Sequence, residues 1–448
     1  SFVIDKANKC FLKDNQFFRY ISGSMDYFRV PEAYWKDRLH KIRMAGLNTV
    51  TSYVEWSGHE PQPGKFNFLG NYDLVEFCKE AQQEDLLVII RVGPFICGER
   101  DNGGLPSWLY SKSLSAKART TDKTFMNAME KWLGQLLPMI KATFYKNGGP
   151  VIALQMENEY GMLMCDKDYM AGVYDMFKKQ VGDDVILFTV DYWREKDQNC
   201  GGIKDMPKAT NMYASDSVAS VESTMNSVNS QGCPLFLMEL YVGWFSEWGQ
   251  ARYSTPSQLL GTFKELLSRN ASVNLYMFHG GTNFGFSAPS RGGTPLLTSY
   301  DYSAPLSDAG DPRDLYLNIR DTIKEFAQLP AGDVPVASQK LNIGAVNLTE
   351  GATLIEVMDY FRQYKWLKSA TQSDPMTFED MGQDYGFVMY TAKAGDVSDP
   401  SLEVSGIKDT AYVVTKDGNH VLDSKTDKAS TKIKKDETIT IIVESHGR

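Results

Sequence analysis

Short apolar runs of strand length alternate with longer amphipathic stretches along residues 1–329 of the 448-residue chain. This order is typical of a parallel sheet wrapped by helices. The apolar runs begin near eight positions, at Tyr20, Thr49, Leu86, Val151, Val185, Asn211, Pro234 and Ser272. Eight such repeats predict an α/β fold of the (β/α)₈ TIM barrel class. A doubly wound sheet normally has fewer strands and a phosphate-binding glycine turn after its first strand.

Helix start signals agree with this assignment. Pro31, Pro256 and Pro312 each stand just before an amphipathic stretch, where proline suits the first turn of a helix. A longer helix buries one apolar stripe and contains Pro138, which we expect to introduce a kink. The expected helices cover 34–45, 125–144, 259–268 and 315–328.

The chain changes character after residue 329. Residues 330–342 are expected to form a linker, because proline and glycine interrupt the helical pattern there. Residues 343–448 show short strand-like runs between polar turns, which predicts an antiparallel, β-sandwich-like domain. These runs are 386–391, 411–415 and 438–443. The last run lies five residues from the end of the chain, so we expect an exposed sheet edge unless something else covers it, and a truncated β domain.

Charge and hydropathy then exclude several classes of partner. Lysine and arginine total 47 against 56 aspartate and glutamate, a net charge of −9, and no basic block could neutralise a row of phosphates. Nucleic acid is therefore not an expected partner, and no apolar run is long enough to span a membrane. The chain begins at Ser1 without an apolar leader, and Asn270 and Asn347 begin N-glycosylation sequons. We expect an exported chain from which a signal peptide has been removed.

The six cysteines do not predict a metal site, because they form no Cys-x-x-Cys pair and no histidine stands at zinc-ligand spacing. They are Cys10, Cys78, Cys97, Cys165, Cys200 and Cys233. Buried small hydrophobic residues are one interpretation, and an oxidised pair in an exported chain is the other.

Two of the predicted barrel strands end in carboxylates. The apolar run 151–156 is followed by Glu157 and Glu159, and the run 234–238 is followed by Glu239. A carboxylate directly after a buried strand is costly unless it is hydrogen-bonded or functional. One interpretation pairs these residues with barrel arginines or lysines. The other is a carboxylate pair facing across the mouth of the barrel, as glycoside hydrolysis requires. Strand alternation does not decide between Glu157 and Glu159, because both have the same parity.

Several motifs closely resemble glycoside hydrolase family 35. They are FRYISGS (18–24), WKDRL (35–39), MAGLN (44–48), HEP (59–61), GGLP (103–106), NGGP (147–150), ENEYG (157–161), YMF (276–278) and GGTNF (280–284). The similarity runs from about Phe2 to the end of the chain. It implies hydrolysis of terminal, non-reducing β-D-galactose from glycans or glycoconjugates with retention of configuration, without a cofactor.

The resemblance also implies roles for individual residues. Glu159, which follows Asn158, corresponds to the acid/base, and Glu239 corresponds to the nucleophile. The residues that match the galactose subsite, or lie beside it, are Tyr53, Cys97, Gly98, Glu99, Asn158, Tyr241, Trp244, Tyr276 and Tyr302. Cysteines matching Cys165 and Cys200 form a disulfide in similar animal enzymes, and such enzymes imply a lysosomal or secreted location. The partners we consider are β-galactoside glycans, a second copy of the chain, and the remainder of its own β region.

The chain departs from the family pattern at the ends of the first three strands. The usual His, Pro, Asn and Trp of the motifs are replaced by Asp26, Glu55, Ser57 and Arg100. The three charged residues among them could pair with one another. These substitutions motivate two alternatives to a β-galactosidase. One is a catalytically weak paralogue that binds glycans or serves as a scaffold, and the other is a β-glycosidase of shifted specificity.

Overall fold

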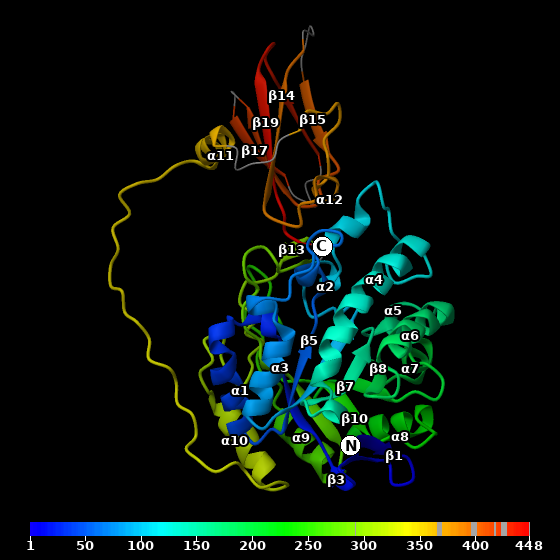
Figure 1. The fold of residues 1–448 in the computed structure, drawn as a ribbon. Helices are drawn as coiled ribbons and strands as arrows, with labels where there is room; N and C mark the ends of the chain where they lie inside the picture. Colours follow the sequence, from blue (N-terminus) through cyan, green and yellow to red (C-terminus); the bar gives the residue numbers. More distant parts are fainter. Residues whose placement is uncertain (292, 365–369, 396–400, 416–417, 423–427, 448) are drawn as a thin grey trace.

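The structure is a computed structural model that describes residues 1–291, 293–364, 370–395, 401–415, 418–422 and 428–447 (Figure 1). Its centre is a closed barrel of eight parallel strands in the order β10-β11-β4-β5-β6-β7-β8-β9. The strands are β4 (Ile21–Met25), β5 (Thr49–Tyr53), β6 (Leu87–Gly93), β7 (Val151–Met156), β8 (Ile186–Tyr192), β9 (Lys208–Met212), β10 (Phe236–Tyr241) and β11 (Ser272–His279). The predicted barrel is therefore confirmed, and all eight apolar runs supply its strands.

Helices surround the barrel and follow most of its strands. They are α1 (Trp35–Met44), α3 (Leu74–Gln83), α4 (Lys123–Ile140), α6 (Lys167–Val181), α7 (Glu195–Gly201), α8 (Val218–Val228), α9 (Leu259–Ser268) and α10 (Asp314–Lys324). Side-chain caps fix several starts, as where the carboxylate of Asp122 accepts a hydrogen bond from the backbone N–H of Phe125. The helix predicted over 125–144 ends at Ile140, two residues after Pro138, and continues as a 3₁₀ turn. None of the helices in the described ranges is long and apolar enough to cross a bilayer.

Short elements complete the barrel part of the chain. The strands β1 (Phe2–Asp5), β2 (Cys10–Lys13) and β3 (Gln16–Phe18) form an antiparallel sheet. The short helices and hairpin strands are η1 (Tyr27–Arg29), η2 (Glu32–Tyr34), α2 (Trp56–His59), η3 (Gly70–Tyr72), η4 (Asp101–Gly104), η5 (Ser107–Tyr110), η6 (Lys141–Thr143), η7 (Tyr145–Asn147), α5 (Tyr160–Leu163), β12 (Ser290–Arg291) and β13 (Thr294–Pro295).

Two apolar clusters pack the outside of the barrel and fill the end of the barrel where the strands begin. The larger cluster packs the outward-facing side chains of the strands, such as Val88 and Ile90, against the surrounding helices. The smaller cluster joins inward-facing side chains such as Ile89 to Phe11 of the N-terminal sheet. The rings of Phe11 and Phe236 meet edge to face, 5.6 Å apart. The N-terminal sheet thus covers the end where the strands begin, and the opposite end is left for the site.

The C-terminal part of the chain is built from antiparallel strands. Residues 328–353 contain neither helix nor strand. The elements that follow are α11 (Leu354–Gln363), α12 (Phe378–Met381), β14 (Phe387–Lys393), β15 (Ser401–Ser405), β16 (Thr410–Thr415), β17 (Gly418–Leu422), β18 (Lys428–Lys432) and β19 (Thr438–Glu444). The antiparallel β domain is confirmed. Its predicted boundaries, 330–342 for the linker and 343–448 for the domain, stay a prediction.

The last strand, β19, is not itself an edge of its sheet. The main sheet has the order β14-β19-β16-β17, so β19 pairs on both sides and the edges are β14 and β17. Sequence position alone does not reveal this, because the last strand inserts between two earlier ones. The alternating apolar pattern of Thr438–Glu444 is compatible with either place in a sheet.

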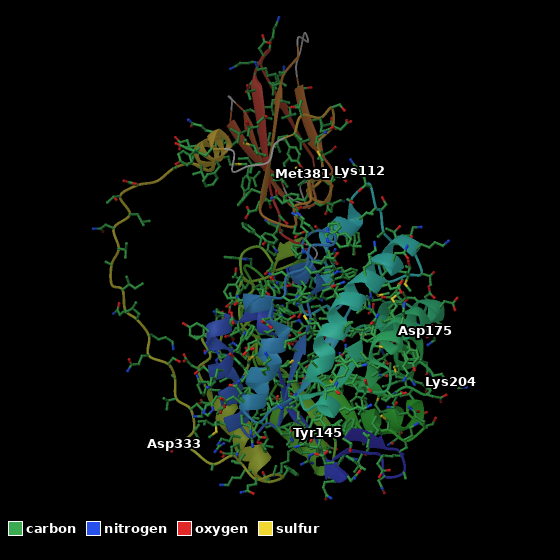
Figure 2. The ribbon with its side chains drawn as sticks, viewed as in Figure 1. Lys112, Tyr145, Asp175, Lys204, Asp333 and Met381 are labelled. Carbon is green, nitrogen blue, oxygen red and sulfur yellow. A yellow bond between two sulfur atoms is a disulfide. The ribbon has the colours of Figure 1, made fainter. Side chains whose placement is uncertain are left out.

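The β domain contacts the barrel on loops beside its open end. The backbone N–H of Lys112 donates to Asp380 over 2.7 Å, and the rings of Phe286 and Phe387 lie 5.4 Å apart. Figure 2 shows Lys112 and Met381 where the two parts meet. The hydroxyl of Ser290 also donates to the carbonyl of Gly447 over 3.1 Å. The β domain therefore adjoins loops at the open end of the barrel.

The predicted disulfide between Cys165 and Cys200 is confirmed, and it joins the loop after α5 to α7 across 35 residues of chain. Loop-closure entropy gives such a bond a stabilising effect of about 3 to 4 kcal/mol. The double variant Cys165→Ala/Cys200→Ala is therefore expected to lose that much free energy of unfolding, as measured by urea denaturation. Cys233→Ala, which removes a buried free thiol, is the control. A double variant as stable as the parent would contradict the expectation.

Candidate active site

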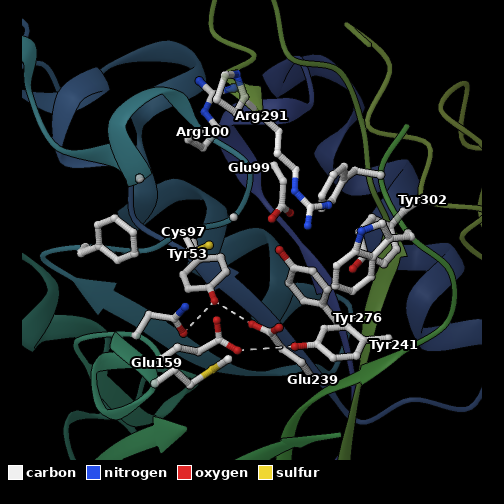
Figure 3. A pocket seen from close by; sticks show the side chains of 18 of the residues that line it. Tyr53, Cys97, Glu99, Arg100, Glu159, Glu239, Tyr241, Tyr276, Arg291 and Tyr302 are labelled. Atoms are coloured by element: carbon white, nitrogen blue, oxygen red, sulfur yellow. Dashed lines mark hydrogen bonds between the residues drawn. The ribbon is translucent and has the colours of Figure 1, made fainter. Parts of the chain in front are cut away.

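A pocket of about 590 Å³ opens at the carboxyl ends of the barrel strands (Figure 3). All eleven residues predicted as catalytic or sugar-binding line it: Tyr53, Cys97, Gly98, Glu99, Asn158, Glu159, Glu239, Tyr241, Trp244, Tyr276 and Tyr302. They come from at least five different strands or strand-end loops, because the parallel strands of a barrel all end on one face. The structure thus brings the predicted set together, while the role of each residue stays a prediction.

Glu239 lies within β10 and is held by two donors. The Arg91 guanidinium donates to its Oε1 over 2.6 Å, and the hydroxyl of Tyr53 donates to the same oxygen over 2.7 Å. Arg91 is completely buried, so its charge requires a carboxylate partner. Both donors bind Oε1, which leaves Oε2 as the oxygen that neither donor engages.

Glu159 occupies a different electrostatic environment. The amide of Asn211 donates to its Oε1 over 2.8 Å, and the Tyr241 hydroxyl lies 3.5 Å from that oxygen. Burial, followed by the nearby negative charge of Glu239, raises the pKa of Glu159 to about 7. Figure 3 shows the Glu159 and Glu239 side chains reaching toward each other. The pocket therefore holds one carboxyl group that keeps its proton to near neutrality beside a second one that is bound by the Arg91 guanidinium.

Glu157, the other candidate on this strand end, faces away from the pocket. Its carboxylate accepts from the guanidinium of Arg119 over 2.7 Å and from the hydroxyl of Tyr169 over 2.7 Å. Pairing with an arginine of the barrel part is thus the correct interpretation for Glu157. Alternation could not separate it from Glu159, because β7 ends at Met156 and both glutamates have positive φ, 56° and 49°.

The side-chain amide of Asn158 has a fixed orientation. Its Oδ1 accepts from Arg91 over 2.9 Å and from Gln155 over 3.0 Å, and the Tyr53 oxygen lies 3.0 Å away. With two donors on the oxygen, the amide nitrogen is the group that can donate to a ligand in the pocket. Arg91 donates to both Asn158 and Glu239, so one hydrogen-bond network orients both.

The loop after β6 contributes a third carboxyl group, Glu99. Burial raises the pKa of Glu99 to about 7, although a hydrogen bond from the Tyr300 hydroxyl opposes the shift. The hydroxyls of Tyr276 and Tyr300 lie 3.2 Å apart, which links the loop to the end of β11. Burial also raises the pKa of the neighbouring Cys97, so this residue presents a thiol and not a thiolate.

Aromatic rings form one wall of the pocket. The centroids of Tyr241 and Trp244 lie 5.2 Å apart, those of Trp244 and Tyr302 6.0 Å, and those of Tyr276 and Tyr302 5.4 Å. Such a wall can cover the apolar face of a pyranose, while the tyrosine hydroxyls bond to its polar edge.

The charged departures from the family pattern do form ion pairs. Arg100 makes a bidentate pair with Glu55, at 2.6 and 2.9 Å. Asp26 pairs instead with Arg29, at 2.7 Å, so the expected pairing holds for two of the three charged residues. Ser57 lies in α2.

Sequence reasoning missed three residues that shape the site: Arg91, Asn211 and Tyr300. Arg91 carried a usable signal, because it is a lone charged residue inside the apolar run of β6. Asn211 and Tyr300 carried none, since neither lies in a family motif or follows an apolar run. Their roles depend on contacts with Glu159 and Glu99, which lie 52 and 201 residues away in the chain.

The profile of the family described as Glycosyl hydrolases family 35 matches residues 10–326, which hold the whole barrel. The chain belongs to glycosyl hydrolases family 35. A second profile, described as Beta-galactosidase, first all-beta domain, matches residues 375–448 of this family 35 chain. The family predicted from the motifs is therefore confirmed.

Relatives of this family 35 chain are named as β-galactosidases. That of Bos taurus is 43% identical over 423 residues, covering 92% of this chain and 64% of the bovine protein. That of Mus musculus is 40% identical over 459 residues, covering 100% of this chain and 70% of the mouse protein. A Mus musculus protein named Beta-galactosidase-1-like protein is 40% identical over 424 residues, with coverage of 92% and 64%. The chain thus spans about two thirds of the length of these relatives.

Solved structures share the fold of this family 35 chain. A GH5_18 protein of Streptomyces cattleya, solved in complex with GlcNAc, superposes with a TM-score of 0.50 at 11% identity. The match covers 70% of this chain and 83% of that one. A β-D-glucuronidase of Dictyoglomus thermophilum also gives a TM-score of 0.50 at 11% identity, covering 73% and 54%. At such identities the likeness concerns the fold alone.

Proposed function

We propose that the chain is a retaining exo-β-galactosidase that removes terminal, non-reducing β-D-galactose. The observation that carries the proposal is the unequal carboxyl pair in the pocket. Glu239 is bound to Arg91 and Tyr53 as a carboxylate, whereas the pKa of Glu159 is raised to about 7 by burial and by the charge of Glu239. A nucleophile and an acid are what the two steps of a retaining glycosidase require.

In the first step Glu239 attacks and Glu159 donates a proton. Because Arg91 and Tyr53 both bind Oε1 of Glu239, Oε2 is the oxygen that forms the bond to the anomeric carbon. The bond from that carbon to the glycosidic oxygen breaks, and the proton of Glu159 moves to this oxygen. The aglycone leaves as an alcohol, and galactose stays attached to Glu239.

In the second step Glu159 acts as a base. It takes a proton from water, and the water oxygen attacks the anomeric carbon as the bond to Glu239 Oε2 breaks. Galactose leaves with its original configuration, Glu159 is again protonated, and Glu239 is again a carboxylate. The role of Arg91 follows from this cycle, since it stabilises Glu239 both as the free nucleophile and as the leaving carboxylate.

The remaining pocket residues support galactose as the sugar. The carboxyl of Glu99 can accept from two neighbouring hydroxyls, the amide nitrogen of Asn158 can donate to another, and the wall of Tyr241, Trp244 and Tyr302 can pack on the sugar ring. The relatives' names support β-galactosides as the substrate class.

We also propose a lysosomal or secreted location. The Cys165–Cys200 disulfide favours an oxidising compartment. Asn270 and Asn347, which begin the two sequons, are exposed, as an acceptor of N-linked glycan must be.

A mechanism-based label tests the proposed function. A 2-deoxy-2-fluoro-β-galactoside with an activated leaving group is expected to inactivate the protein and to remain bound to Glu239, as read by peptide mass spectrometry. The fluorine slows both steps, and the activated leaving group restores the rate of the first alone, so the galactosyl intermediate accumulates. Labelling of another residue would overturn the assignment. Turnover at background level for several β-galactosides, with galactose binding intact, would favour the weak, glycan-binding paralogue.

A further inference from the structure

The turn that carries Glu99 has an unusual backbone. Cys97, Gly98 and Glu99 are three consecutive residues with positive φ, at 55°, 54° and 44°. This region is unfavourable for residues with a Cβ atom and persists only where surrounding contacts fix it. The direction of the Glu99 side chain therefore depends on whatever holds this turn.

Arg29 makes the contacts that hold the turn. Its Nη2 donates to the carbonyl oxygens of Gly98 and Glu99, over 3.1 Å in the second case. Its guanidinium lies 3.8 Å from the centroid of the Tyr300 ring, and the hydroxyl of that ring donates to the Glu99 carboxylate. Arg29 thus fixes both the backbone and the side chain of Glu99, although it is itself only 1% exposed.

Arg29 is held in turn by a buried carboxylate and a buried amide. Asp26 Oδ2 accepts from its Nη1 over 2.7 Å, and Asn283 Oδ1 accepts from its Nε over 2.9 Å. The other oxygen of Asp26 accepts from the backbone N–H of Tyr53 over 3.0 Å. The Asp26–Arg29 pair therefore also ties the turn to the end of β5.

A second buried pair joins the first at Asn283. The same Oδ1 accepts from Arg100 Nη1 over 2.9 Å, and Arg100 is paired with Glu55. The segments after β4, β5, β6 and β11 are thus connected through one amide oxygen. Asp26, Glu55 and Arg100, which replace the family's usual residues, all belong to this network.

We propose that Arg29 is a positioning residue which, held by Asp26 and Asn283, fixes the left-handed turn at 97–99 so that Glu99 faces the sugar. This inference rests on the proposed function, in which Glu99 binds galactose hydroxyls. Arg29 acts through Glu99, so its loss weakens sugar binding more than it slows the chemistry at Glu159 and Glu239.

A double-mutant cycle with galactose as the ligand tests this role. Arg29→Lys and Glu99→Gln are each expected to raise the dissociation constant of galactose about tenfold or more, as measured by titration calorimetry. The double variant is expected to bind galactose as Glu99→Gln does, within about twofold. Once the Glu99 carboxylate is gone, the loss of Arg29 has no carboxylate left to misplace. For aryl β-galactosides, KM should rise more than kcat falls in Arg29→Lys. Additive effects, or an Arg29→Lys variant with unchanged affinity, would overturn the proposal.

Two further variants separate positioning from general damage. Asp26→Asn keeps the shape of the side chain and the acceptor for the Tyr53 N–H but removes the charge that holds Arg29. It is expected to weaken galactose binding in the same non-additive way. It takes the place of Arg29→Lys in the double-mutant cycle if Arg29→Lys does not fold. Arg38→Lys alters another buried arginine, on α1, whose Nη2 donates to Ala309. It should leave the dissociation constant unchanged.

The outcomes distinguish this proposal from the proposed function. Normal hydrolysis by the parent protein with additive effects in the cycle would overturn the role of Arg29 alone. Galactose binding with the expected coupling, but no hydrolysis of any β-galactoside, would overturn the hydrolase function and leave the positioning role standing. A parent protein that neither binds galactose nor hydrolyses a β-galactoside would overturn both.

Discussion

Replacing Glu239 by glutamine is expected to lower kcat for aryl β-galactosides about 10⁴-fold or more, because the amide cannot form the galactosyl intermediate. The loss should be the same for good and poor leaving groups, since both substrates need the nucleophile. The same change removes the negative charge that contributes to the raised pKa of Glu159, so this pKa should fall. Initial rates on a panel of substrates with different leaving groups measure the effect.

Azide distinguishes a lost nucleophile from a damaged pocket. In Glu239→Ala, azide can take the place of the carboxylate and attack the anomeric carbon directly, which yields α-galactosyl azide. Glu265→Gln, on the exposed side of α9, is the matched control and should keep parental activity. A Glu239→Gln variant that retains a substantial fraction of kcat would show that another group is the nucleophile.

Replacing Glu159 by glutamine is expected to separate substrates by their leaving groups. A poor leaving group such as methanol needs protonation, so its release should slow about 10²- to 10⁴-fold. A dinitrophenolate leaves without a proton, so the first step with that substrate should change little. Stopped-flow measurement of the dinitrophenolate burst, beside steady-state rates on the methyl galactoside, checks both expectations.

The pH dependence follows from the same group. Glu159 donates its proton only while protonated, and its pKa is raised to about 7 by burial and by Glu239. In the parent protein, kcat/KM for poor leaving groups should therefore fall as pH rises through about 7. This limb should be absent from kcat/KM in Glu159→Gln. A limb that persists unchanged in the variant would assign the titration to a different group, such as Glu99.

The barrel could be predicted from the sequence because its strands are buried on both faces and read as continuous apolar runs. The strand displaced furthest from its predicted start, β9, begins at Lys208, three residues before Asn211. Lys208 is buried and donates its ammonium proton to the carbonyl of Val228 over 3.0 Å. A charged side chain that reaches out of the sheet in this way gives no apolar signal.

Site residues could be predicted where they lie beside apolar runs and inside family motifs. They could not be predicted where contacts with residues distant in the sequence determine the direction of a side chain. Asn158, Glu159 and Glu239 stand directly after or within apolar runs and inside matching motifs. The separation of Glu157 from Glu159 depends on Arg119, which lies 38 residues upstream in a loop. No local pattern encodes that contact, since it exists only once the barrel has closed.

The central position of β19 in its sheet determines when the main sheet of the β domain can form during synthesis. In the barrel, strands from β4 to β11 pair mostly with their sequence neighbours, so each new strand adds to a sheet already begun. In the β domain, β14 and β16 do not pair with each other. Each pairs with β19, which follows both in the sequence. During synthesis, β14 and the β16–β17 hairpin therefore remain separate, with unpaired backbone groups, until residues 438–444 have left the ribosome. The barrel can assemble progressively, whereas the main sheet of the β domain waits for one late strand.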